Sequence, residues 1–299
     1  ATEAPIDEED AFRNSGRLVF NPYSIDDMQA LYKQDPKFTA DIVVNISVKD
    51  DNTIPNSKVK LRDDGEGDLK IWAVPNCLQV ENRYLVSVDI GGKSTTSDYT
   101  VMTVIDRFGM IPTVKGKPKV VARYRGHVRH DKLAWMAAAL AHYYDDALLV
   151  IESNTADREK NNNTEGDHFL TILQEIADYY DNLYQRTSSS ENVEDNVLAK
   201  YGFQTNKLTK QQVIDNLEEF IDDNLYEEPD KEMYHELRIY ERHDDGSLGN
   251  IVGNGNHDDV VMSTGIGLFV SLTDMEKPSW KKAERRSRGG DGVHTAAKI

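Results

Sequence analysis

The sequence predicts an α/β fold built on a mixed central β-sheet with helices on both faces. Three short runs rich in Val, Ile and Tyr, at residues 84–89, 99–105 and 119–124, indicate antiparallel strands separated by turns. A helical pattern at residues 131–144 follows, and then a compact apolar strand at residues 147–152. Three antiparallel strands, a helix, a strand parallel to the first and further helices imply a mixed sheet covered by helices.

Further segments extend this core at both ends. Residues 1–80 form a β-rich N-terminal segment, with one helix expected to begin at Ser24 as its N-cap. Residues 81–275 form the main domain, and residues 276–299 form a basic tail that we expect to be disordered. The main domain should also contain a short strand at residues 182–186 and helical segments at residues 167–180, 209–224, 229–240 and 257–272.

The composition is that of a globular chain without an internal disulfide. The 299 residues are 38% hydrophobic and 29% charged, and no apolar run approaches the roughly 18 residues of a membrane span. The N-terminal residues show no signal-peptide pattern, and the single cysteine, Cys77, fits a reducing compartment. The net charge of -17 argues against nucleic-acid binding through overall charge, although a local basic strip remains compatible with it.

Carboxylates stand at the ends of the central strands and at the start of the last helix. Asp89 ends the first central strand, and Glu152 closes the later parallel strand. Asp258 and Asp259 open the last helix. In α/β proteins, sites form at the carboxyl ends of strands and at helix N-termini. Because Mg²⁺ and Mn²⁺ prefer oxygen ligands, and two such ions can drive phosphoryl chemistry, the pattern indicates a metal-dependent site.

Each of these residues also has a purely structural interpretation. Asp89 can begin a turn, and Glu152 can face solvent at a strand end. Asp258 and Asp259 can serve as ordinary N-caps, which the helix dipole favours. Three further polar residues fit plain surface positions on the sequence alone: Asp98, His243 and His257. The alternatives remain open at the level of single residues, and only the joint placement of the carboxylates favours a site.

The segment GGKS at residues 91–94 resembles the end of a phosphate-binding loop but lacks the rest of that motif. The motif requires a glycine where this sequence has Ser87, and the turn here leads into a strand rather than a helix. The sequence therefore shows no ATPase motif.

Four segments, in this order, resemble the nuclease domain of tailed-bacteriophage terminase large subunits: VDIGGKSTTSDYTVMTVID, LLVIESN, KYGFQTNKLTKQQVIDNLEEFI and GNHDDVVMS. The resemblance covers about residues 8–272 and implies a ribonuclease H-like fold. It further implies an endonuclease that cuts double-stranded viral DNA concatemers during genome packaging. On this resemblance Asp89, Glu152 and Asp259 are the expected catalytic residues, and the expected metal ligands are Asp89, Asp98, Glu152, Asp258 and Asp259. Asp259 is preferred over Asp258 as the essential member of its pair.

The resemblance also implies cofactors and partners. The cofactors would be two Mg²⁺ or Mn²⁺ ions. The partners would be double-stranded DNA, a packaging ATPase domain, the portal and the small terminase subunit, in the host cytoplasm and without a membrane. Because the ATPase motif is missing, we expect an excised nuclease domain or a motor on a separate polypeptide. The basic strip at residues 115–129 is a candidate DNA contact, although a solvated strand edge explains it equally well.

Two other functions remain open from the sequence. The first is another ribonuclease H-like nuclease, of the resolvase or transposase type. The second is a non-catalytic module that docks on a packaging motor.

Overall fold

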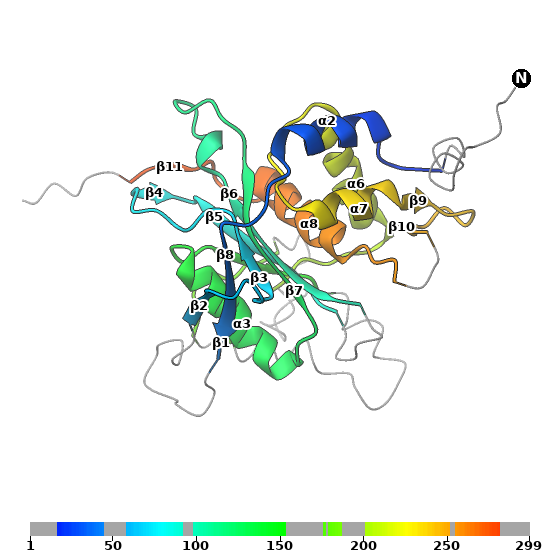
Figure 1. Cartoon of the computed structure of the whole chain (residues 1–299). Coiled ribbons are helices and arrows are strands. Elements are labelled where there is room, and N and C mark those ends of the chain that lie inside the picture. The colour runs from blue at the N-terminus through cyan, green and yellow to red at the C-terminus, as the bar shows by residue number, and fades with distance from the viewer. Residues whose placement is uncertain are drawn as a thin grey trace, which may run out of the picture.

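The computed structural model describes residues 17–44, 58–91, 98–153, 176–177, 179–186, 201–251 and 255–281. Within these residues a seven-stranded sheet forms the centre of the molecule, with the strand order β2-β1-β3-β7-β6-β5-β8 (Figure 1). The strands of this sheet are β1 (Phe38–Val43), β2 (Lys58–Arg62), β3 (Leu69–Ile71), β5 (Tyr84–Asp89), β6 (Thr100–Asp106), β7 (Lys119–Gly126) and β8 (Leu148–Ile151). β5, β6 and β7 pair antiparallel, whereas β8 pairs parallel to β5. The predicted mixed sheet is confirmed.

Helices cover both faces of the sheet, as the sequence predicts. On one face, α3 (His130–Tyr143) packs its alanine-rich surface against β1, β2, β5 and β8. On the other face, α8 (Asp259–Thr273) lies against β5 and β6, and α6 (Lys207–Asp222) and α7 (Lys231–Arg238) pack behind it (Figure 1). Every residue of β6 is buried, because a strand covered on both faces has no solvent side.

Helix α2 (Pro22–Tyr32) begins earlier than the sequence predicts. Ser24 was expected as the N-cap, but the side chain of Asn21 accepts a hydrogen bond of 3.0 Å from the amide of Tyr23. Pro22 occupies the first helical position, where its missing N–H has no intrahelical partner to lose. The Ser24 assignment was therefore wrong, because the Asn-Pro pair provides the stronger start signal.

Several other segments differ from the expected pattern. Helix α7, which Asp230 caps through a bond of 3.3 Å from the amide of Glu232, is shorter than the helix expected at residues 229–240, and Tyr240 lies in a strand instead. Residues 182–186 form isolated bridges rather than a strand, through Leu183 and Gln185. Most of the helix expected at residues 167–180 lies outside the described residues.

The first and the last strands of the described residues pair in different sheets. β1, β2 and β3 extend the central sheet beside β7, so the sheet continues across the segment boundary expected near residue 80. Ser279–Trp280, expected within a disordered tail, forms β11 and pairs with β4 (Val80–Glu81). β9 (Tyr240–Arg242) and β10 (Leu248–Asn250) form a separate antiparallel pair.

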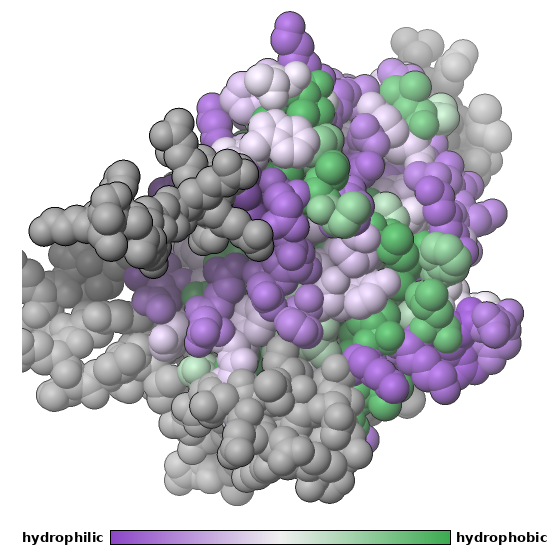
Figure 2. All heavy atoms as spheres, turned by 90° about the vertical axis from the view of Figure 1, so that its left-hand side faces the viewer, coloured by the Kyte–Doolittle hydropathy of each residue, from purple (hydrophilic) through white to green (hydrophobic). Residues whose placement is uncertain are grey.

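The surface near β4 and β11 mixes residue types. Figure 2 shows hydrophilic and hydrophobic residues side by side on this face of the molecule. Among the described helices, none has the length and apolar character needed to cross a bilayer.

Candidate functional site

Asp89 and Glu152 meet at the carboxyl ends of two parallel strands. Val88 of β5 pairs with Ile151 of β8, and the amide of Glu152 donates a bond of 2.9 Å to the carbonyl of Val88. Asp89 and Glu152 are the next residues on these strands, which lie about 4.8 Å apart in any sheet. The Glu152 carboxyl group lies close enough to Asp89 to raise its pKa. The structure therefore joins the two carboxylates that the sequence places on separate strands.

The start of α8 adds Asp258 and Asp259 to this pair. Burial, the adjacent Glu152, and the charges of Asp259 and Asp258 raise the pKa of Asp89 well above its ordinary value. Burial also raises the pKa of Asp259 to about 7, with further contributions from Asp98 and Asp258. Groups that perturb each other in this way are close in space, since exposed charges interact weakly beyond about 10 Å. Four carboxylates thus share one end of the sheet.

The N-cap interpretation of the two helical aspartates fails for Asp258. Its side chain makes no capping bond, although its backbone occupies the N-cap position. The side chain of Glu236, from α7, instead accepts bonds from the amides of Val260 at 2.9 Å and Val261 at 3.1 Å. Because Glu236 satisfies two of the N-terminal amides of α8, these amides need no cap from Asp258 or Asp259.

Asp98 and His257 extend the cluster toward solvent. His257 Nδ1 lies 3.3 Å from Asp98 Oδ1 and 3.8 Å from Asp259 Oδ2. One ligand atom of each of these three residues lies within 4.8 Å of the others, which is close enough to share a cation. The amide of Tyr99 fixes Asp259 through a bond of 2.8 Å to Oδ2. Asp98, expected as a metal ligand, is therefore placed beside Asp259.

His257 is the residue that the sequence pattern missed. It was interpreted as a surface histidine, but its side chain is only 19% exposed and lies between two carboxylates. The local sequence does not show this, because the partner Asp98 lies 159 positions away in the chain. His243, by contrast, pairs with Glu241 at 3.3 Å beside the β9–β10 turn.

Cationic and aromatic side chains border the acidic cluster. Lys210 Nζ, from α6, lies 3.2 Å from Asp258 Oδ2. The guanidinium of Arg125, from β7, lies 3.8 Å from the centre of the Tyr99 ring. The Tyr99 ring also stacks on the His127 ring, with 4.3 Å between the ring centres. These groups provide positive charge and flat surfaces next to the carboxylates, which suits contact with a phosphodiester backbone.

The basic strip at residues 115–129 does not form one surface. Arg123 is buried at 1% exposure, whereas Arg125 and His127 reach the border of the acidic cluster. Lys119 lies at the other end of the sheet, opposite Asp106. Of this strip, only the residues near Arg125 lie where they can contact a molecule bound at the acidic cluster.

A recess lies elsewhere on the molecule. Its volume is about 480 Å³, and its lining includes Tyr84, Leu148, Asp274 and Lys281. Tyr84 and Leu148 begin β5 and β8, whereas the carboxylates follow the ends of these strands. This recess is therefore separate from the acidic cluster.

Comparisons with known proteins concern the fold. No protein-family model and no curated protein matches the sequence. Among solved structures, the large terminase nuclease from thermophilic phage G20c with bound magnesium matches over 85% of this chain and 97% of its own, at 17% identity and a TM-score of 0.49. The same nuclease with bound cobalt matches over 67% and 86%, at 21% identity and a TM-score of 0.44.

A more distant match lies outside the phages. The human cytomegalovirus terminase nuclease domain, soaked with Mn and bound to an inhibitor, matches over 64% of this chain and 84% of its own, at 8% identity and a TM-score of 0.39. The order of elements expected for the mixed sheet is observed directly: three antiparallel strands are followed, after a helix, by a strand parallel to the first of them.

The donor set fits a hard divalent cation. Carboxylate oxygens predominate, and the raised pKa values of Asp89 and Asp259 show that their negative charges repel each other and are poorly solvated. A bound dication removes this repulsion, which is the environment in which Mg²⁺ or Mn²⁺ binds well.

The raised pKa of Asp259, which burial causes in the first place, predicts a pH effect on the metal-free protein. The pKa of Asp259 is about 7 in the folded state, against about 3.9 in an unfolded chain, so the folded state binds the extra proton. The resulting stabilisation is present below about pH 4 and is lost as the pH rises through about 7. In EDTA, the melting temperature should therefore fall as the pH rises from about 5 to about 7. Asp259→Asn should remove much of this fall, and a pH-independent melting temperature in the unsubstituted protein would contradict the assignment.

Proposed function

We propose that this chain is a divalent-metal-dependent endonuclease that cuts double-stranded DNA. The observation that carries the proposal is the convergence of Asp89, Glu152 and Asp259 from two strands and a helix at one end of the sheet. A set of carboxylates that repel one another in a folded protein is costly unless a cation or a proton accompanies them. Phosphodiester hydrolysis is the chemistry that two such cations support best.

The residues divide into two groups for this role. Asp89 and Glu152 would hold one ion, and Asp259 with Asp98 and His257 would hold the other. Two Mg²⁺ or Mn²⁺ ions bound there would supply an activated water and stabilise the leaving oxygen. The protein itself orients the ligands, through the Tyr99 amide on Asp259 and the β5–β8 pairing at Asp89.

Positive side chains at the border would position the DNA. Lys210 and Arg125 lie beside Asp258 and Tyr99, where a phosphate next to the bound ions would be found. No base-reading motif is visible in the sequence, so we expect weak sequence preference. Contact through phosphates also makes binding sensitive to salt.

The packaging context rests on the sequence resemblance together with the similar fold. On that basis the substrate is concatemeric viral DNA, and the partners are a packaging ATPase domain, the portal and the small terminase subunit. The resolvase or transposase interpretation differs from this in one respect that can be measured, namely a preference for branched over linear duplex.

A plasmid assay tests the proposal. Supercoiled plasmid with Mn²⁺ should become nicked and then linear, and EDTA should prevent both products. Asp259→Asn should reduce the rate by about 10²-fold or more, since metal ligands contribute several kcal/mol to the barrier. Asp274→Asn is the matched control, because Asp274 lies at the opposite end of α8 and bonds Tyr184.

Three outcomes would count against the proposal. Equal activity of the Asp259→Asn and Asp274→Asn proteins would reject the assigned site. A strong preference for four-way junctions over linear duplex would favour the resolvase alternative. Absence of any Mn²⁺ binding by calorimetry would favour the non-catalytic docking module.

A further inference from the structure

Helix α8 lies unusually close to the sheet, at a point just below the acidic cluster. A side chain at Gly267 would place its Cβ 2.7 Å from Ser87 Oγ and 2.7 Å from Ile105 Cδ1. A side chain at Gly265 would lie 2.9 Å from Val213 of α6. A real Cβ atom essentially never lies this close to another heavy atom, so glycine at both positions lets α8 fit between the sheet and α6.

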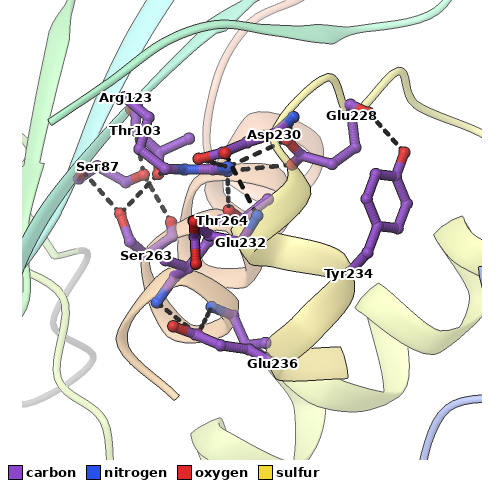
Figure 3. Close-up of polar contacts among 12 residues, drawn as sticks. Ser87, Thr103, Arg123, Glu228, Asp230, Glu232, Tyr234, Glu236, Ser263 and Thr264 are labelled. Carbon is purple, nitrogen blue, oxygen red and sulfur yellow. Dashed lines mark hydrogen bonds and ion pairs between the residues drawn. The ribbon is translucent and has the colours of Figure 1, made fainter. Parts of the chain in front are cut away.

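Two serines hold this close contact in both directions. Ser87 Oγ of β5 donates to the carbonyl of Ser263 at 2.6 Å, and Ser263 Oγ of α8 lies 3.1 Å from the carbonyl of Ser87 (Figure 3). Ser263 Oγ also lies 3.0 Å from Thr103 Oγ1. Each hydroxyl has one proton, and one assignment satisfies all three: Thr103 donates to Ser263, Ser263 to the Ser87 carbonyl, and Ser87 to the Ser263 carbonyl.

A buried arginine continues this network. Arg123 Nε donates to Thr103 Oγ1 at 3.3 Å, and one terminal nitrogen donates to Thr264 Oγ1 at 2.8 Å. The remaining N–H groups bind Glu228 and Asp230, at 3.0 to 3.1 Å (Figure 3). All five guanidinium donors therefore have acceptors, which leaves Arg123 no alternative position. The network joins β5, β6, β7 and α8 into one unit.

These contacts fix the position of Asp259 along the helix axis relative to Asp89 on the strand. Asp89 is two residues beyond Ser87 on the same face of the strand, a distance of about 6.6 Å. Asp259 is four residues before Ser263 on the same face of the helix, a distance of about 6 Å. The helix runs antiparallel to the strand, so both distances are measured in the same direction from the serine contact. Because the two distances are nearly equal, Asp89 and Asp259 lie side by side at the same end of the sheet.

We propose that the reciprocal Ser87–Ser263 hydrogen bonds are a positioning device that sets the separation of the Asp89 and Asp259 carboxylates for metal binding. This inference rests on the proposed function, since it assigns these carboxylates to bound cations. In this role neither serine contacts the substrate. Ser87 acts through Asp89 on β5, and Ser263 acts through Asp259 on α8. A shift of α8 along β5 would separate the two carboxylates without removing either.

The test compares two serine-to-alanine variants on the same helix. Ser263→Ala removes the hydroxyl next to the site, whereas Ser271→Ala removes one that binds Arg107 Nε at 2.9 Å near the other end of α8. Both serines are buried, so both substitutions should lower the melting temperature by similar amounts. Mn²⁺ binding by calorimetry and plasmid cleavage are then measured for each protein.

The expected result separates the two variants. Ser263→Ala should weaken Mn²⁺ binding and lower the turnover rate by about tenfold, because displacements near 1 Å strongly reduce catalysis, while the KM for DNA stays unchanged. Ser271→Ala should keep Mn²⁺ binding and turnover. If Ser263→Ala does not fold, Ser87→Ala removes the other half of the same contact and serves in its place.

Failure of the positioning role and failure of the proposed function would give different results. Unchanged Mn²⁺ affinity in Ser263→Ala, or equal losses in both variants, would overturn the positioning role while leaving the nuclease proposal intact. An unsubstituted protein that neither binds Mn²⁺ nor cuts DNA would overturn the proposed function, and the positioning role would fall with it.

Discussion

Asp89→Asn is expected to abolish DNA cleavage and, in metal-free buffer, to raise the melting temperature. The substitution removes a carboxylate that the site needs for its cations, so the rate should fall by about 10³-fold. It also removes a charge that burial, Glu152, Asp259 and Asp258 all disfavour, as the raised pKa of Asp89 shows. Without metal at pH 8, the asparagine protein should melt a few degrees higher.

Asp106→Asn provides the opposite case at the other end of the same strand pair. Asp106 accepts bonds from Arg83 Nε at 2.9 Å and Nη2 at 2.8 Å, and both side chains are 4% exposed. Removing its charge leaves Arg83 buried beside a weaker partner, so stability should fall by about 3 kcal/mol or more. Below its melting temperature this protein should still cleave DNA.

The contrast separates a functional carboxylate from a structural one. Thermal unfolding in EDTA and plasmid cleavage in Mn²⁺ are measured on both variants. A loss of stability in Asp89→Asn comparable to that in Asp106→Asn would show that Asp89 has a paired structural role, and the site assignment would be wrong.

Arg123→Met is expected to produce the largest loss of stability among the substitutions considered. Arg123 is 1% exposed and forms ion pairs with Glu228 and Asp230, which are themselves buried. Burial raises the pKa of Glu228 even with Arg123 present, so this carboxylate has little solvation of its own. Loss of one partner of a buried ion pair typically costs 3–5 kcal/mol, which corresponds to roughly 10 °C in a chain of this size.

Two further proteins show that the loss comes from unpaired buried charge. The triple variant Arg123→Met, Glu228→Gln, Asp230→Asn should recover part of the stability, because its buried groups are neutral. Arg62→Met removes a partly exposed arginine that bonds Asp41 and Asp64, and should change the melting temperature little. A small effect of Arg123→Met in thermal unfolding would mean that the network contributes little to the fold.

The strands and carboxylates could be predicted because their signals are local. β5 is an apolar run that ends on Asp89, and β8 is an apolar run followed by Glu152, so periodicity and turn residues place both carboxylates at strand ends. The signal for the start of α2 is also local, but two candidate N-cap residues, Asn21 and Ser24, lie close together in the sequence. The proline after Asn21 decides between them.

Other features depend on contacts that no local pattern contains. Glu236 looks like an ordinary helical glutamate, yet it caps a different helix 24 positions later. His257 gains its partner only when the loop before β6 folds beside α8. Arg123 belongs to a basic run that suggests a surface, but its acceptors arrive from the segment before α7. Such long-range pairs decide whether a polar residue is structural or functional.

A crystal soaked in Mn²⁺ and recorded at the manganese absorption edge examines the central claim directly. Paired anomalous peaks should lie within about 2.5 Å of carboxylate oxygens from Asp89, Glu152 and Asp259, with His257 beside the outer peak. Density for manganese only at exposed surface carboxylates, with none between β5, β8 and α8, would contradict the account.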